Sequence, residues 1–147
     1  MNRTLGRFRS GAFTLIELMV VMVILGILAT LIMPKILERP EQAKRTKARV
    51  QIEAFRSALQ QFKLDTGRYP TTAEGLDALV TNPGSLKNYQ NGGYLDKVPQ
   101  DPWGNKYVYQ CPGKNSRDFD IVCYGADGQP SGTGHDADIE SWNMEGN

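Results

Sequence analysis

The strongest constraint in this 147-residue sequence is an apolar run near its start, Phe13–Met33. Glu17 is the only charged residue in the run, and the sixteen residues of Leu18–Met33 carry no charge. A helix of about 21 residues is about 31 Å long, close to the roughly 30 Å hydrocarbon core of a bilayer. Because a helix also satisfies its own backbone hydrogen bonds in lipid, we expect Phe13–Met33 to be a transmembrane helix.

The single acidic residue in this run, Glu17, needs a partner. A carboxylate in an apolar medium costs several kcal/mol unless it is paired or protonated. We therefore expect a positively charged group to meet Glu17. The alternative is a carboxylate that lies shallow enough in the bilayer to reach the lipid headgroups.

Positive charge is concentrated in the first twelve residues, which contain Arg3, Arg7 and Arg9 and no acidic residue. The chain has 17 basic and 16 acidic residues, so the remainder has 14 and 16 and a net charge of −2. This balance excludes the basic groove typical of a nucleic-acid-binding protein. A basic segment before an apolar helix stays on the cytoplasmic side, so we expect the residues after Met33 to lie in the periplasm.

The periodicity of residues 41–63 predicts an amphipathic helix that ends near Gly67. Pro34 and Pro40 both precede this region and predict bends there. The apolar positions recur at spacings of four, three, four and three. They form one stripe, which we expect to cover a small sheet: Ala48, Ile52, Phe55, Leu59 and Phe62.

Short elements are predicted after this helix. Thr71 or Thr72 is expected to cap a helix over Ala73–Val80, and a polar, variable loop follows at 81–93. Alternating β-forming residues predict an antiparallel hairpin with strands at 106–111 and 118–124. A long helix with a small antiparallel sheet indicates the α+β class.

The two cysteines, Cys111 and Cys123, lie in the predicted strands. A periplasmic location permits a disulfide between them. If the hairpin closes directly after Cys111, however, the cysteines are several residues apart along the strands and have opposite parity. Their separation then exceeds the usual Cα distance of about 4.4–6.8 Å, and only a bent register would join them. The sequence leaves the disulfide open.

The segment Tyr124–Trp142 is rich in glycine, serine and acidic residues, with carboxylates at Asp127, Asp136 and Asp138. Such a loop buries little apolar surface of its own. Carboxylate and carbonyl oxygens are the ligands that Ca²⁺ prefers, although the spacing is not that of an EF-hand. These residues alone leave a calcium site and a solvated acidic loop both open. His135, the only histidine, is expected to be exposed to solvent rather than catalytic.

The segment GAFTLIE, Gly11–Glu17, resembles the prepilin-peptidase site of type IV pilin-like proteins. It differs in one respect, because Ala12 follows Gly11 where the family usually has glycine directly before phenylalanine. Cleavage after Ala12 makes Phe13 the first residue and leaves Glu17 at the family's spacing. Cleavage after Gly11 would shift Glu17 by one residue, so we favour the first position.

Three later motifs resemble those of the major pseudopilins of the type II (general) secretion pathway. They are Tyr69-Pro70-Thr71-Thr72, Gly93-Tyr94-Leu95 and Asp101-Pro102-Trp103-Gly104-Asn105. The resemblance extends from Gly11 to about Trp142. The last motif is also a turn on local grounds, because proline presets φ and glycine or asparagine adopts positive φ. We expect its Trp103 to pack under the long helix.

The resemblance implies a pilin-like structural subunit rather than an enzyme. It divides the chain into a cleaved leader at 1–12, a transmembrane helix at 13–33 and a periplasmic domain at 34–147, with a helix at about 35–66 and an acidic loop at 124–142. Phe13 would be N-methylated after cleavage. The Glu17 carboxylate would pair with the terminal ammonium group of a neighbouring subunit.

The resemblance further implies that the subunits polymerise into a periplasmic pseudopilus that drives folded proteins across the outer membrane. The implied partners are other copies of the chain, minor pseudopilins, a prepilin peptidase and an inner-membrane assembly platform. One Ca²⁺ is implied in the acidic loop, with side-chain oxygens from Asp127 and Asp136 or Asp138 and carbonyls from Tyr124, Thr133 and Ile139. The alternatives are a type IV pilin for adhesion or motility, and an anchored periplasmic protein that keeps residues 1–12 and never assembles.

Overall fold

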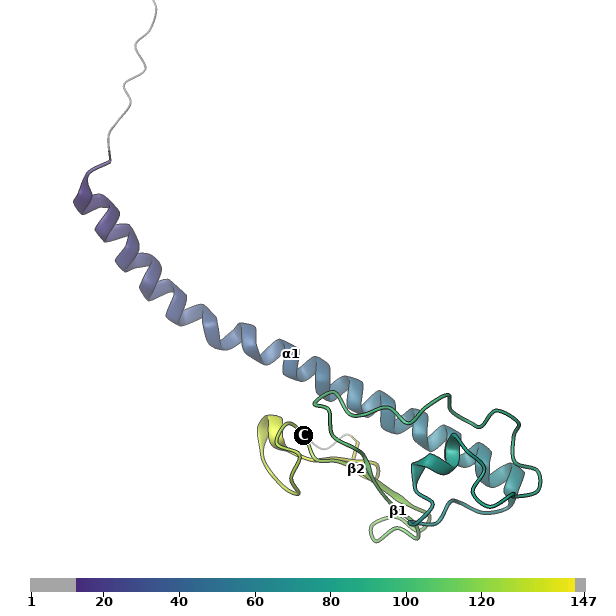
Figure 1. The fold of residues 1–147 in the computed structure, drawn as a ribbon. Coiled ribbons are helices and arrows are strands. Elements are labelled where there is room, and N and C mark those ends of the chain that lie inside the picture. Colours follow the sequence, from purple (N-terminus) through teal and green to yellow (C-terminus); the bar gives the residue numbers. More distant parts are fainter. Residues whose placement is uncertain (1–12, 145–147) are drawn as a thin grey trace, which may run out of the picture. The chain divides into compact units, whose positions relative to one another are not determined.

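The computed structural model describes the backbone of residues 13–144 and the side chains of residues 13–29 and 40–144. Six elements follow one another along the chain (Figure 1). They are the helix α1 (Leu15–Thr66), the 3₁₀ helix η1 (Leu76–Leu79), the strands β1 (Val108–Gln110) and β2 (Asp120–Cys123), the 3₁₀ helix η2 (Gly134–Asp136) and the strand β3 (Ile139–Glu140). The combination of helix and one small antiparallel sheet confirms the predicted α+β class.

The chain divides into two compact units between Arg39 and Pro40. The helical conformation of α1 continues through Pro34 and Pro40, so neither proline separates two helices. A proline removes one helical N–H donor, and the turns around it keep their own hydrogen bonds. Among the described residues, no helical stretch combines the length and the apolar character needed to cross a membrane.

In the second unit, the apolar stripe of α1 is buried as predicted. None of its five residues is more than 1% exposed: Ala48, Ile52, Phe55, Leu59 and Phe62. Figure 1 shows this part of the helix lying alongside the sheet. The helix ends at Thr66, where Gly67 adopts a φ of +81° and donates its N–H to the Lys63 carbonyl at 2.8 Å. The predicted glycine cap is therefore confirmed.

The sheet has the strand order β1-β2-β3, and both pairs of neighbours are antiparallel. Val108 pairs with Val122, and Gln110 pairs with Asp120. The predicted hairpin is confirmed, with strands shorter than predicted. The sequence did not indicate β3, because a two-residue strand is too short to show an alternating pattern.

The turn between β1 and β2 closes around the carboxylate of Asp120, which is only 4% exposed. Backbone N–H groups of Lys114, Asn115 and Ser116 donate to this carboxylate at 2.7, 2.8 and 2.9 Å. Burial acts to raise the pKa of Asp120, but these hydrogen bonds to the charged form outweigh it and lower the pKa. The turn therefore depends on Asp120 remaining ionised.

The short helix predicted at Ala73–Val80 is present only as η1. Before it, the Glu74 N–H donates to Thr71 Oγ1 at 3.3 Å, and the Thr71 N–H donates to Glu74 Oε2 at 2.7 Å. These reciprocal bonds have the pattern of a capping box. Thr71 rather than Thr72 thus makes the capping contacts, and the helix itself begins after Gly75 without a side-chain cap.

Arg68 and Glu74 form a bidentate ion pair beside this turn, with two N–O distances of 2.6 Å. The hydrogen bond from Arg68 is the main reason that the pKa of Glu74 falls to about 2. A carboxyl whose pKa is depressed in the folded state stabilises that state above its ordinary pKa of about 4.3. This contribution is lost as the pH falls toward about 2.

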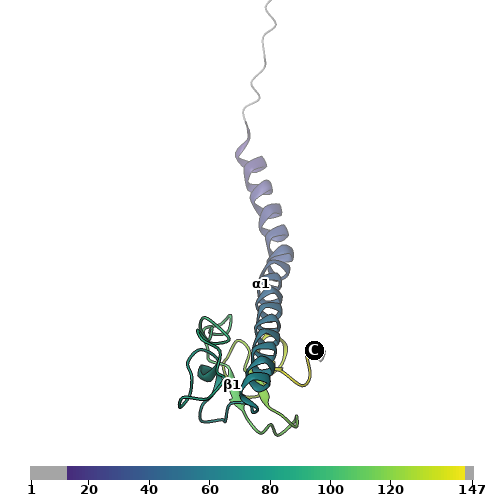
Figure 2. The same ribbon diagram turned by 90° about the vertical axis from the view of Figure 1, so that its right-hand side faces the viewer.

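The polar segment after η1 packs over the end of α1 through aromatic rings. The rings of Tyr89 and Tyr94 lie 6.0 and 5.4 Å from that of Phe62. The Tyr94 N–H donates to the Leu79 carbonyl at 2.7 Å. Gly93 allows this close approach, because a Cβ atom there would lie 2.7 Å from the Val80 carbonyl. Figure 2 shows these teal and green segments gathered on one side of α1.

The Asp-Pro-Trp-Gly-Asn motif forms the predicted turn. Asp101 Oδ1 accepts the N–H groups of Trp103 and Asn105 at 3.0 and 2.8 Å, and Gly104 takes a φ of +95°. The Trp103 side chain packs against the core, and its Nε1–H donates to Glu41 Oε2 on α1 at 2.9 Å. The turn is thereby attached to the helix, as expected for Trp103.

Candidate functional site

The first predicted functional residue, Glu17, lies in the first turn of α1. Thr14 precedes the helix, and its Oγ1 accepts the Glu17 N–H at 3.3 Å. Threonine followed three residues later by glutamate is the spacing of a capping box, which explains why the helix begins here. A carboxylate near a helix N-terminus also interacts favourably with the helix dipole. Of the two residues at the predicted cleavage site, Ala12 lies outside the described residues, and Phe13 is the first residue that the structure describes.

The apolar side chains of the first unit are exposed around the whole helix. The large ones between Phe13 and Leu28 are 46% to 79% exposed. Among the described residues 13–29, Glu17 carries the only charge. A helix that is apolar on all sides becomes stable only when lipid or other helices cover it. This unit therefore has the surface of an anchor or of an assembly core.

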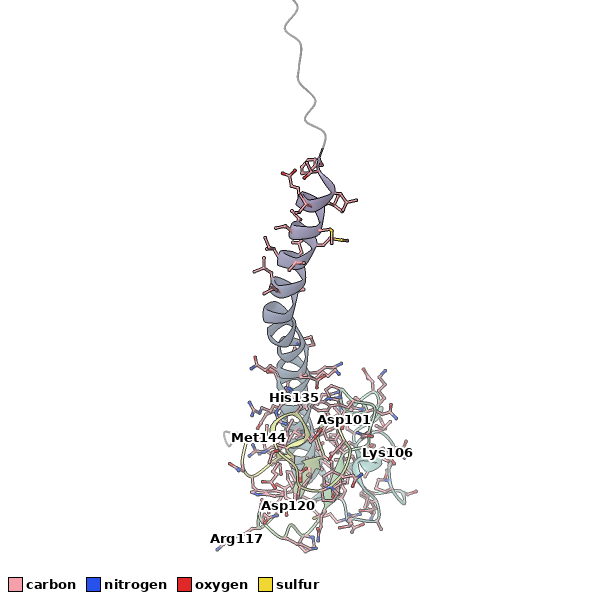
Figure 3. The ribbon with its side chains drawn as sticks, turned by 90° about the vertical axis from the view of Figure 1, so that its left-hand side faces the viewer. Asp101, Lys106, Arg117, Asp120, His135 and Met144 are labelled. Carbon is pink, nitrogen blue, oxygen red and sulfur yellow. The ribbon has the colours of Figure 1, made fainter. Side chains whose placement is uncertain are left out.

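The acidic loop is closed at its base by the pairing of β2 with β3. Cys123 pairs with Ile139. Tyr124 follows β2 directly and Ile139 begins β3, so these two predicted carbonyl donors flank the part of the acidic loop between the two strands. Figure 3 shows His135, which belongs to this loop, and Arg117 at opposite ends of the second unit. The acidic loop and the β1–β2 turn thus occupy opposite ends of the sheet.

Two glycines allow the acidic loop to pack on its own backbone. Gly125 and Gly132 adopt φ values of +66° and +127°. A Cβ atom at these positions would lie 2.7 and 2.5 Å from the backbone carbonyl oxygen of Asp136. The loop is therefore a compact structure, in which the Asp136 backbone is enclosed by two turns.

The carboxylates of the loop differ in their surroundings. Asp127 Oδ1 accepts the Gln129 N–H at 3.0 Å, and Asp138 Oδ2 accepts the Ser131 N–H at 3.0 Å. Asp138 Oδ1 is buried and has no hydrogen-bond partner. A buried carboxylate oxygen without a donor fits a cation ligand, because an unsatisfied buried acceptor is costly. Asp127, Asp136 and Thr133 are exposed.

The structure does not gather these side chains into a dense cluster. Within the described part of the chain, no three carboxylate, histidine or cysteine side chains are close enough together to hold a metal. A calcium ion at this loop would therefore need carbonyl oxygens in addition to Asp138. His135 is exposed, as predicted.

The two cysteines are free thiols in this structure. Extending the β1–β2 register places Cys123 beside Tyr107, four residues along the strand from Cys111. Four residues of strand correspond to about 13 Å, well beyond a disulfide's Cα separation of about 4.4–6.8 Å. Cys123 is fully buried and donates to Asp101 Oδ2 at 3.3 Å. Burial first, and Asp101 second, raise the pKa of Cys123 to about 12.

Reasoning from the sequence missed one residue of the loop's surroundings, Arg45 on α1. Its Nη1–H donates to the Ala137 carbonyl at 2.6 Å, across 92 residues of sequence. In the sequence Arg45 lies three residues before Ala48 and seven before Ile52, so helical spacing places it in line with the buried stripe. This spacing was a signal that Arg45 faces the domain, but it could not identify Ala137 as its partner.

Comparisons with known proteins assign both parts of the chain. Residues 35–142 match the family model of type II secretion system protein G, and residues 7–33 match the prokaryotic N-terminal methylation motif. The type II secretion system core protein G of Pseudomonas aeruginosa is 50% identical over 139 residues, which cover 92% of this chain and 97% of that protein. The corresponding protein of Vibrio cholerae is 49% identical, covering 93% of this chain and 94% of that one.

A solved structure agrees with these matches. It is that of the major pseudopilin from the type 2 secretion system of enterohaemorrhagic Escherichia coli, with a TM-score of 0.62 and 40% sequence identity. The alignment covers 73% of this chain and 93% of that one. The motifs, the α+β domain and the relatives agree, and the chain belongs to the type II secretion system protein G family, the major pseudopilins.

Proposed function

We propose that this chain is made as a precursor, cleaved between Ala12 and Phe13, and polymerised into a periplasmic pseudopilus that drives folded proteins across the outer membrane. The observation that carries the proposal is the first unit, whose apolar surface is exposed on all sides and interrupted by Glu17 alone among residues 13–29. A surface of this kind is stable only in lipid or against other helices. Assembly of the filament would move this apolar surface from lipid into contact with the helices of other subunits.

Specificity in that exchange must come from packing and from a charge pair. Lipid tails are as apolar as the helix surface, so no hydrophobic force favours one partner over another. The ammonium group that cleavage creates at Phe13 is the natural partner of a Glu17 carboxylate on the neighbouring subunit. Each charge alone is costly to bury, and together they attract strongly in a medium of low dielectric constant.

The location follows from the same segment. We propose that residues 13–33 cross the inner membrane once, with the basic residues 1–12 in the cytoplasm and the domain after Met33 in the periplasm. The prepilin peptidase and an assembly platform in the inner membrane would act on this precursor, and minor pseudopilins would join the filament. The basic leader and the uncharged run Leu18–Met33 support this orientation.

The test of the proposal is the N-terminus of the native product. We expect the chain purified from membranes that contain the peptidase to begin at Phe13 and to carry one extra methyl group there. N-terminal sequencing and intact-mass spectrometry measure both properties. A product that begins at Met1 would remove the ammonium group from the assembly region and contradict the proposal, whereas a product that begins at Ala12 would contradict the position of the cut.

We further propose that the acidic loop holds one calcium ion, which would neutralise its carboxylates and tie them to the sheet. Asp127 and Asp136 or Asp138 would supply side-chain oxygens, and Tyr124, Thr133 and Ile139 would supply carbonyls. The buried, unpartnered Asp138 Oδ1 supports this role most directly. Closure of the loop by β2 and β3 supports it as well, because the pairing holds both ends of the loop in place.

A chelator is therefore expected to lower the melting temperature of the full chain in detergent. A ligand present at 100 times its dissociation constant stabilises the folded state by about 2.7 kcal/mol, or about 10 °C for a domain of this size. Asp127→Ala should abolish the difference between chelated and calcium-loaded samples. Asp96→Ala, an exposed aspartate outside the loop, should retain it. Equal melting temperatures of the native chain with and without chelator would count against the calcium site.

A further inference from the structure

We infer that Arg45 is a positioning residue for the cation site of the acidic loop, through which the bound ion and α1 stabilise each other. This inference rests on the proposed calcium site and goes beyond it, because Arg45 lies on the long helix and is not a metal ligand. The proposed ligand is a divalent cation bound in the loop at Asp136–Asp138.

The contact joins two segments that are distant in sequence. Arg45 Nη1–H donates to the Ala137 carbonyl at 2.6 Å, a short distance for a hydrogen bond from a charged donor. Arg45 is partly buried, and Ala137 is 6% exposed. Such a bond fixes the Ala137 peptide group relative to the helix.

Ala137 lies between the two acidic residues that are candidates for the same ligand position. The backbone on the Asp136 side already packs against Gly125 and Gly132, as the close approach of its carbonyl shows. Arg45 holds the next carbonyl along the chain. Glycine turns and a guanidinium group therefore fix two successive peptide groups of the segment that carries the carboxylates.

The next residue, Asp138, carries the buried oxygen that has no donor. Its other oxygen, Oδ2, accepts the Ser131 N–H at 3.0 Å. Arg45 does not bond to either oxygen among the described contacts, although its charge is close enough to interact with Asp138. The guanidinium group thus orients the chain next to the unsatisfied oxygen and leaves that oxygen available to a cation.

Geometry and charge predict opposite effects for removing Arg45. A nearby positive charge repels a cation, so an effect of charge alone would make calcium bind more tightly to a neutral variant. Loss of the hydrogen bond would free the Ala137 peptide group and weaken binding, because groups that orient metal ligands typically contribute 10- to 100-fold in affinity. The sign of the change therefore identifies the role of Arg45.

The experiment titrates calcium into the full chain in detergent micelles and measures the dissociation constant by calorimetry. Arg45→Met removes the donor and the charge but keeps a long side chain, and it should weaken calcium binding at least tenfold. Arg45→Lys keeps a charged donor of similar reach and should bind within about threefold of the native chain. Arg56→Met, at a partly buried arginine that pairs with Glu53 on the same helix, is the matched control and should bind like the native chain.

A purely structural role would lower the melting temperature of Arg45→Met equally with and without calcium and leave the dissociation constant unchanged. A dissociation constant within twofold of the native value, or a lower one, overturns the inference. If the native chain binds no calcium, that result alone contradicts the proposed calcium site, and it is distinguishable from a failure of the inference on Arg45.

A measurement on the native chain keeps the inference testable if Arg45→Met does not fold. Coupling between sites is reciprocal. If Arg45 favours calcium binding, bound calcium must therefore stabilise the hydrogen bond between Arg45 and the Ala137 carbonyl. Hydrogen exchange of the backbone amides around Arg45, at about residues 42–49, should slow when calcium is added. Unchanged exchange there, with calcium demonstrably bound, overturns the inference.

Discussion

Replacing Glu17 with alanine is expected to abolish pseudopilus assembly while the subunit remains processed and in the membrane. Removing one partner of a buried ion pair typically costs about 3–5 kcal/mol, because the other charge is left uncompensated. That is a loss of about two to four orders of magnitude in the association constant of each subunit contact. Electron microscopy of filaments sheared from cells, with immunoblots of the membrane fraction, measures the two results separately.

Two further variants separate the charge of Glu17 from its size. Glu17→Gln has almost the same shape without the charge and should fail to assemble, whereas Glu17→Asp should retain part of the assembly. The pair joins two molecules, and a Glu17→Ala subunit still offers its own ammonium group. It should therefore enter mixed filaments with native subunits. Normal filaments made of Glu17→Ala alone would refute the pairing.

Replacing Phe62 with alanine is expected to destabilise the second unit by about 3–5 kcal/mol, the usual cost of deleting a buried aromatic ring. Phe62 is completely buried, and its ring contacts those of Tyr89 and Tyr94. The deletion would leave a cavity and release the segment after η1 from α1. Because whole domains are stable by only about 5–15 kcal/mol, a large share of the native stability would be lost.

Leu64 provides a control two residues away. It is 78% exposed, so Leu64→Ala should change stability by no more than about 0.5 kcal/mol. Urea denaturation of the full chain in detergent, followed by tryptophan fluorescence, measures both variants. A difference of less than about 1 kcal/mol between them would show that the ring of Phe62 does not organise this end of the domain.

The features predicted correctly from the sequence depend on neighbours a few residues apart. The buried stripe from Ala48 to Phe62 follows from helical periodicity, and Gly67 and Gly104 take the positive φ that their turns require. Such signals are local, because a helix turn or a tight turn is complete within about four residues. The family resemblance depended on the same kind of local motif.

The predictions from the sequence failed where local signals compete or where no local signal exists. The helix expected at Ala73–Val80 is reduced to η1, since Thr71, Arg68 and Glu74 hold the preceding residues in a separate turn. β3 has only two residues and exists because it pairs with β2. No pattern in a two-residue stretch could have indicated it.

The sequence by itself determined the apolar helix with its single acidic residue, the core stripe and the turns, because each of these depends on spacing along the chain. Only the tertiary structure decided that Arg45 holds Ala137, that Trp103 bonds to Glu41 and that the cysteines lie far apart. These contacts join residues 92 and 62 positions apart or depend on strand register. The physical reason is that such pairs meet only after the hydrophobic core has brought distant segments together, so no local pattern records them.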